Sequence, residues 1–159
     1  MDKVDPVEIL LVEDNPRDAE LTIRALKKNN LANHLVHVQD GIDALDFLFA
    51  KGEYEGRTGH NLPKVVLLDL KLPKLNGLEV LRILRQDVRT CTLAIVVITS
   101  SAEDPDIKSA YELGANSYVI KPVNFDSFLE AMGHLGVYWL LVNKPLKVRP
   151  ITNGKEMYE

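Results

Sequence analysis

The sequence predicts an α/β domain of the doubly wound type, in which a five-stranded parallel sheet carries helices on both faces. Short runs of branched apolar residues alternate along the chain with segments of helical periodicity. The connections between them are mostly short, and strands joined through a helix pair in parallel, so both faces of the sheet are covered. The length of 159 residues suits one domain with a core of its own.

The central predicted strand is the run 65–68, which is apolar throughout and is followed by a carboxylate, Asp69. Pro73 cannot donate to a sheet ladder, and Asn76-Gly77 supplies turn chemistry before the next helix. The other strands are expected at residues 7–12, 34–38, 93–98 and 117–120.

Helices are expected between the strands and after the last one. Asn15 followed by Pro16 is a typical helix start, Asn124 is a second capping residue, and Gly114 is a typical helix end. The connection at 51–63 is long for a compact domain, which indicates a functional or mobile segment. The expected helices cover residues 16–29, 41–49, 77–86, 104–113 and 125–142.

Composition and charge exclude several classes of function. The net charge of −4 argues against direct binding of nucleic acid, and the single cysteine, Cys91, rules out an internal disulfide and a thiolate zinc site. No apolar run reaches the roughly 18 residues of a transmembrane helix, and the charged start 1–3 is not a signal peptide. We therefore expect a cytoplasmic protein without membrane contact. The histidines lack metal-binding spacing, and motifs for nucleotide hydrolysis, esterase or metalloprotease chemistry are missing from the sequence.

Polar residues follow four of the predicted strands: Glu13 and Asp14, then Asp69, Thr99 and Lys121. The carboxyl ends of parallel strands share one edge of the sheet, where ligands bind, so these side chains should face one crevice. Each alone is more often structural; Asp69 by itself could be a helix cap or a loop residue. Three carboxylates in one crevice repel one another, and a divalent cation removes that conflict. With oxygen ligands only, Mg²⁺ fits better than zinc or copper.

These groups together suit phosphoryl transfer to a carboxylate. An ionised Asp69 needs no general base to attack phosphorus, because it already carries the negative charge. The metal ion and Lys121 would offset charge on the phosphoryl oxygens, and Thr99 would add a hydroxyl.

Four motifs carry a resemblance to a known family: residues 11–15 (Leu-Val-Glu-Asp-Asn), 67–73 (Leu-Leu-Asp-Leu-Lys-Leu-Pro), 98–101 (Ile-Thr-Ser-Ser) and 115–122 (Ala-Asn-Ser-Tyr-Val-Ile-Lys-Pro). Over roughly residues 7 to 142 the chain resembles the receiver domains of two-component response regulators. The resemblance implies a flavodoxin-like receiver fold. We expect this domain at residues 1–143, an irregular tail at 144–159, and no output domain.

The resemblance implies a signalling protein that accepts a phosphoryl group from a sensor histidine kinase on Asp69. Such a protein assists its own phosphorylation and dephosphorylation, and is not an enzyme acting on a separate substrate. Mg²⁺ would be held by the carboxylates of Glu13, Asp14 and Asp69 and by the backbone carbonyl of Lys71.

Other residues receive their roles from the same resemblance. Lys121 would pair with the phosphoryl group, and Thr99 would reach it in the active state. Thr99 and Tyr118 would form the conformational switch, while Lys71 and Ser101 would flank the path of the hydrolytic water and tune the phosphoryl lifetime. The long connection and the missing output domain look like the stand-alone regulators paired with cyanobacterial phytochrome kinases.

Two other functions compete with this interpretation. A flavodoxin-like binding module could use the same crevice without phosphorylation, but it leaves the convergence of the acids, Thr99 and Lys121 unexplained. A receiver-like docking module that works without phosphorylation would be favoured by a missing acceptor or lysine, and both residues are present.

The end of the last helix predicts a protein–protein surface, most simply a homodimer contact. Phe128, Met132, Leu135 and Trp139 follow helical spacing and can form the core stripe. The six residues 137–142 are all apolar, so one helix cannot bury all of them against its own sheet. This leaves an interface that includes Val137, Leu140 and Leu141. The alternative is that the tail folds back and covers them through Leu146, Val148 and Ile151.

Overall fold

The computed structural model describes residues 7–57, 61–146, 148–152 and 155–158. Its sheet has five parallel strands in the order β2-β1-β3-β4-β5. The fold class expected from the sequence is confirmed. The strands are β1 (Ile9–Val12), β2 (Leu35–Val38), β3 (Val65–Leu68), β4 (Ile95–Thr99) and β5 (Ser117–Ile120).

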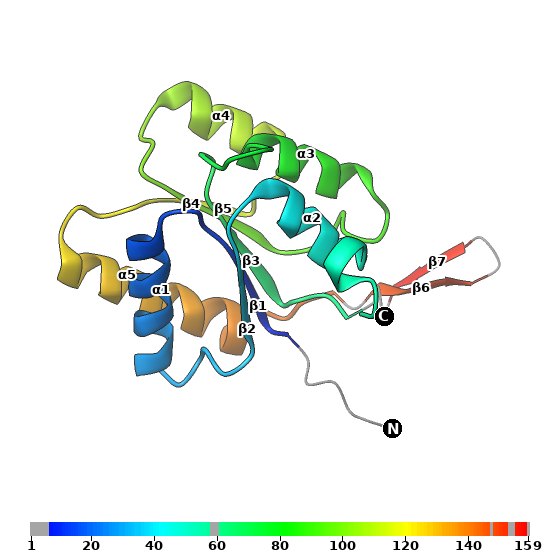
Figure 1. The fold of residues 1–159 in the computed structure, drawn as a ribbon, viewed down its shortest axis with the longest axis horizontal. Helices are drawn as coiled ribbons and strands as arrows, with labels where there is room; N and C mark the ends of the chain where they lie inside the picture. Colours follow the sequence, from blue (N-terminus) through cyan, green and yellow to red (C-terminus); the bar gives the residue numbers. More distant parts are fainter. Residues whose placement is uncertain (1–6, 58–60, 147, 153–154, 159) are drawn as a thin grey trace.

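Helices cover both faces of the sheet (Figure 1). One group packs Ala44, Leu48, Val80, Leu84 and Ala110 against one face, and the other packs Ala19, Leu26, Phe128 and Met132 against the opposite face. The first group is α2 (Gly41–Phe49), α3 (Gly77–Gln86) and α4 (Asp104–Glu112); the second is α1 (Pro16–Lys28) and α5 (Phe125–Val137). None of the described helices is long and apolar enough to cross a membrane.

The strand register brings the polar strand ends together. Val12 on β1 is level with Leu68 on β3, and the Asp69 N–H donates to the Val12 carbonyl at 3.1 Å. At the other side of the sheet Thr99 is level with Ile120, and the Lys121 N–H donates to the Thr99 carbonyl at 2.7 Å. Because all strands are parallel, the side chains that follow β1, β3 and β5 emerge at one edge.

The long connection after α2 is anchored by Arg57. Its guanidinium lies over the Phe47 ring, 3.5 Å from the centroid, and donates to the carbonyls of Phe47 and Asn61. A short 3₁₀ turn, Gly52–Tyr54, precedes it, and the Tyr54 ring meets Phe47 edge to face. The described part of this segment is therefore tied to the end of α2.

Two expectations for the end of the chain were wrong. The segment expected to be irregular contains an antiparallel hairpin, β6 (Val148–Thr152) and β7 (Lys155–Tyr158). Leu140, expected at an interface, is only 5% exposed and belongs to the core against α1 and α5.

A wide helical turn explains the burial of Leu140. Residues Tyr138–Val142 form a π-helical turn, in which the Asn143 N–H donates to the Tyr138 carbonyl at 2.7 Å. A π turn rotates less per residue than an α turn, so Leu140 returns toward the side of Phe128 and Met132. Leu135 and Trp139, expected in the core stripe, pack at its margin and are only partly buried.

This arrangement predicts unequal losses of stability when two adjacent leucines are truncated. Leu140→Ala should lower the free energy of unfolding by about 2–5 kcal/mol, because it opens a cavity in a packed core. Leu141→Ala is the matched control, since Leu141 is 69% exposed; its effect should stay within about 0.5 kcal/mol. Urea unfolding followed by circular dichroism measures both. Equal losses for the two variants would contradict the burial of Leu140.

Candidate functional site

Three carboxylates meet at the carboxyl edge of the sheet. They belong to Glu13, Asp14 and Asp69, and we call them the acid group. Glu13, Asp14 and Asp69 each offer an oxygen, and these oxygens lie within 4.8 Å of one another. Glu13 is 3% exposed and Asp69 7%, whereas Asp14 is exposed. The group is thus buried on one side and open to solvent on the other. All of its side-chain donors are oxygens, which suits a hard cation such as Mg²⁺ with part of its coordination left for water.

Lys121 places its ammonium among carboxylates from three elements. The Nζ atom lies 2.5 Å from Glu13 Oε1, 2.8 Å from Asp69 Oδ2 and 2.9 Å from Asp18 Oδ2. The Lys121 side chain is 9% exposed, so these contacts lie in a largely desolvated position. Burying acidic side chains without such a partner would be costly.

The pKa values of this group diverge. Burial raises the pKa of Glu13 to about 7, although the hydrogen bond from Lys121 opposes the shift and the charge of Asp69 adds to it. Burial also acts to raise the pKa of Asp69, but the hydrogen bond and charge of Lys121 outweigh it, so that pKa is lowered. The pKa of Lys121 is raised: its burial acts to lower it, and the bonds to Asp69, Glu13 and Asp18 outweigh that burial. Asp69 is therefore ionised at neutral pH and Lys121 is charged.

The turn after β3 holds Asp69 in place. The Lys71 N–H donates to Asp69 Oδ1 at 3.2 Å, which places Lys71 directly beside the acid group. The Gly77 N–H donates to the Leu70 carbonyl at 2.8 Å, so the start of α3 lies against this turn. A Cβ at Gly77 would collide with the Asp69 carbonyl oxygen. Only glycine allows this close approach.

The loop after β4 connects Thr99 with Tyr118. Thr99 is fully buried, and its hydroxyl accepts from the Ser101 N–H at 3.4 Å. The Tyr118 hydroxyl donates to the Ser101 carbonyl at 2.9 Å, and Ser101 Oγ donates to Asp106 on α4 at 2.5 Å. Ser101 thus joins the end of β4 to β5 and to the first turn of α4.

A family model, the response regulator receiver domain, matches residues 9–133. The chain belongs to the response regulator receiver domain family. Within residues 9–133 the strands and helices follow the order expected from the resemblance. Within this family a receiver is a signalling domain of two-component systems, and the strand-end carboxylates, threonine and lysine described above lie inside the matched region.

Solved structures of stand-alone regulators are similar to this receiver. The Mn²⁺-bound form of response regulator Rcp1 from Synechocystis sp. has a TM-score of 0.81 and 34% identity, covering 88% of this chain and 99% of that one. The phosphorylated cyanobacterial phytochrome response regulator RcpA has a TM-score of 0.81 and 32% identity, covering 88% and 98%. The bacteriophytochrome response regulator AtBRR has a TM-score of 0.69 and 50% identity, covering 89% and 100%.

Sequence reasoning missed two side chains that the receiver brings to this region. Asp18 contacts Lys121 from the first turn of α1, and Asp106 contacts Ser101 from the first turn of α4. Neither follows a strand, so the rule that located the other residues did not include them. The sequence did offer a signal for Asp18. It stands three residues after the capping Asn15, in the first turn of the helix that follows Glu13 and Asp14.

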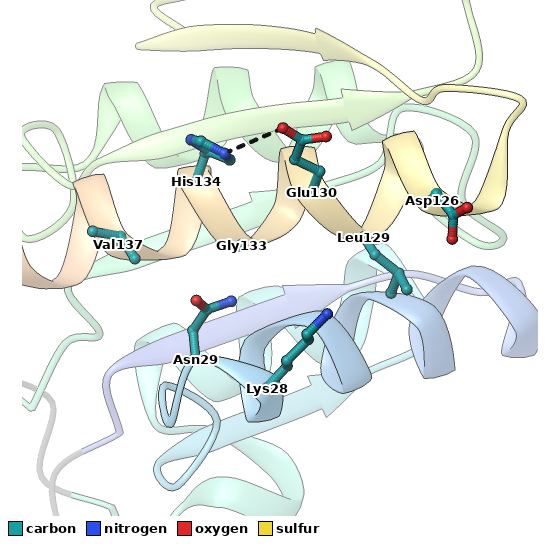
Figure 2. A pocket seen from close by; sticks show the side chains of 8 residues that line it. All are labelled: Lys28, Asn29, Asp126, Leu129, Glu130, Gly133, His134 and Val137. Carbon is teal, nitrogen blue, oxygen red and sulfur yellow. Dashed lines mark ion pairs between the residues drawn. The ribbon is translucent and has the colours of Figure 1, made fainter.

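A second hollow lies away from the acid group, between α1 and α5. This open groove has a volume of about 680 Å³. Figure 2 shows Lys28 and Asn29 on one side and α5 on the other, where His134 and Glu130 form an ion pair. Its lining mixes both charges with apolar side chains and brings together no group of acids like that at the sheet edge. The group at the strand ends is therefore the candidate functional site.

The close approach of α3 predicts that Gly77→Ala damages the acid group. The added methyl must displace the Asp69 backbone, so Mg²⁺ affinity should fall by about tenfold, the loss typical of disturbed support around a metal site. Gly56→Ala is the matched control because nothing lies within 4 Å of its added Cβ. Isothermal calorimetry with MgCl₂ measures the Mg²⁺ affinity of both variants. Wild-type affinity in Gly77→Ala would show that Mg²⁺ binding does not depend on the close approach of α3 to Asp69.

Proposed function

We propose that this receiver accepts a phosphoryl group on Asp69 from a sensor histidine kinase, in a Mg²⁺-dependent reaction in the cytoplasm. The observation that carries the proposal is the position of Asp69, whose ionised carboxylate lies 2.8 Å from the Lys121 ammonium and offers an oxygen within 4.8 Å of oxygens of Glu13 and Asp14. A buried anion beside both a fixed ammonium and a group of oxygens that can hold a metal ion suits in-line attack on phosphorus.

The chemistry balances without a general base. An Asp69 oxygen attacks the phosphorus of phosphohistidine, the P–N bond breaks, and the leaving imidazole takes up a proton. The product is an acyl phosphate on Asp69. Lys121 offsets charge on the transferred group. Mg²⁺, when bound by Glu13, Asp14, Asp69 and the Lys71 carbonyl, would neutralise further charge on the phosphoryl oxygens.

Thr99 and Tyr118 are proposed as the residues that change conformation when Asp69 is phosphorylated. The Thr99 hydroxyl now accepts a bond from the Ser101 N–H, and an acyl phosphate would offer it a stronger, charge-assisted partner. Movement of Thr99 would shift Ser101, and with it the carbonyl that holds Tyr118 at 2.9 Å. Lys71 and Ser101, the neighbours of the acceptor and of Thr99, would set the phosphoryl lifetime by controlling access of water.

A phytochrome-type kinase is the proposed donor. The support is the similarity to RcpA and AtBRR. The matches cover 98% of the RcpA chain and 100% of the AtBRR chain. The alternative function is docking without phosphorylation. It predicts that the same partner contacts form whether or not Asp69 carries a phosphoryl group.

Removal of the acceptor carboxylate tests the phosphorylation directly. Wild-type protein incubated with Mg²⁺ and a small phosphodonor should gain one phosphoryl group in its intact mass, and Asp69→Asn should gain none. Asp126→Asn, an exposed aspartate on α5, is the control and should label like wild type. Chelation of Mg²⁺ should prevent labelling. A labelled Asp69→Asn chain would refute the assignment of the acceptor.

A homodimer is proposed as the form that transmits the signal. Val137, Tyr138, Leu141, Val142 and Leu146 expose between 36% and 69% of their surface at the end of α5. Leu146 itself is 47% exposed, so its side chain leaves the patch open; the side chains of Val148 and Ile151 lie outside the described part of the chain. Exposed apolar side chains gathered in one short stretch of the chain suit a contact with a second copy of the same surface.

The dimer can be tested without disturbing the core. Leu141→Glu places a charge in the patch, whereas the buried Leu140 must be left intact. We expect a wild-type dimer and a monomeric Leu141→Glu variant in sedimentation velocity runs at high micromolar concentration. Ile42→Glu, at an exposed residue on α2, should sediment like wild type. A wild-type chain that stays monomeric with and without phosphodonor would rule the dimer out.

A further inference from the structure

The Lys121 ammonium has a carboxylate partner outside the acid group. Its three N–H donors face three oxygens, from Glu13, Asp69 and Asp18, all within 2.9 Å. The first two belong to the acids whose oxygens cluster within 4.8 Å, together with Asp14; Asp18 does not. Asp18 is therefore the one partner of Lys121 that a cation in this group would leave untouched.

Asp18 is held firmly by its helix. Its N–H donates to Asn15 Oδ1 at 3.1 Å, and its carbonyl accepts from Thr22 Oγ1 at 2.8 Å. Thr22 and Ala19 are each 3% exposed, so this part of α1 is packed against the sheet. The Asp18 side chain is 28% exposed, compared with 9% for Lys121. The carboxylate thus reaches inward from a fixed backbone.

We propose that Asp18 is a positioning residue that holds the Lys121 ammonium at the phosphoryl site during phosphorylation. This role rests on the proposed function of Asp69. Before the reaction Lys121 is fixed by three anions. A metal ion held by Glu13 and Asp69, and a phosphoryl group on Asp69, would alter two of those contacts. Asp18 keeps one N–H of the ammonium and leaves the others for phosphoryl oxygens.

Two physical arguments favour such an anchor. A lysine side chain ends in a compact charge on a flexible stem, so its position depends on its partners. A bound dication next to the ammonium would repel it, because like charges a few Å apart interact strongly in a desolvated site. The Asp18 carboxylate, 2.9 Å from Nζ, offsets that repulsion from the side of α1.

A purely structural role for Asp18 makes different predictions. An aspartate in the first turn of a helix stabilises it through the helix dipole. In that case its loss would lower the unfolding temperature and leave Lys121 and the phosphorylation rate unchanged.

The first test observes the ammonium itself. In ¹⁵N-labelled protein with saturating MgCl₂, the Lys121 NH₃⁺ signal should be visible, since its protons are protected from solvent exchange. In Asp18→Ala this signal should broaden or disappear. The control is Glu20→Ala, which removes an exposed carboxylate of the same helix that pairs with Arg24, and should retain it. A Lys121 signal that is unchanged in Asp18→Ala would overturn the proposal.

The second test measures phosphorylation by a small phosphodonor at saturating Mg²⁺, at a temperature where every variant is folded. Asp18→Ala should lower the maximal rate by about tenfold, the effect of one charge-assisted hydrogen bond. The concentration of donor at half-maximal rate should change little, and Glu20→Ala should match wild type. A wild-type maximal rate in Asp18→Ala would overturn the proposal. If wild type itself is not phosphorylated, the proposed function fails, and the ammonium signal still decides whether Asp18 anchors Lys121.

Discussion

The ion cluster around Lys121 is the interaction on which the rest of this site depends. One ammonium lies within 2.9 Å of three carboxylates, two of them almost fully buried. Without it the burial of Glu13 and Asp69 would drive both toward the protonated form, and a protonated Asp69 is a poor nucleophile. Lys121 keeps Asp69 ionised, because its hydrogen bond and charge lower the Asp69 pKa, whereas burial raises the pKa of Glu13 to about 7.

Parallel topology makes this cluster possible. The Asp69 N–H bonds to the Val12 carbonyl and the Lys121 N–H to the Thr99 carbonyl, so backbone pairing sets the separation of the functional side chains. Gly77 then brings α3 against the Asp69 backbone, and Ser101 ties the buried end of β4 to Tyr118. Asp69 is therefore joined to the residue after β5 by its ion pair with Lys121, and through the Lys121 N–H to the carbonyl of Thr99 at the end of β4.

Most of the fold could be predicted from the sequence, because apolar strand runs alternate with segments of helical periodicity. Much of the candidate site could be predicted because its residues directly follow the strands. Apolar runs that stop at Glu13, Asp69, Thr99 and Lys121 reveal the edge where ligands bind. Asp18 was missed because helix side chains enter the site through tertiary packing, which no strand pattern encodes. Leu140 was misplaced because an α-helical period was assumed where the chain forms a π turn. The hairpin was missed because Pro150 and Gly154 favour an irregular segment.

The most direct test of the account is to locate the phosphoryl group chemically. After incubation with Mg²⁺ and a phosphodonor, borohydride reduces an acyl phosphate to an alcohol and converts the modified aspartate to homoserine. Cleavage after Lys64 and Lys71 releases residues 65–71, in which Asp69 is the only acidic residue. The account predicts homoserine at position 69 in this peptide and at no other aspartate. Homoserine elsewhere in the chain, or none in a phosphorylated sample, would contradict it.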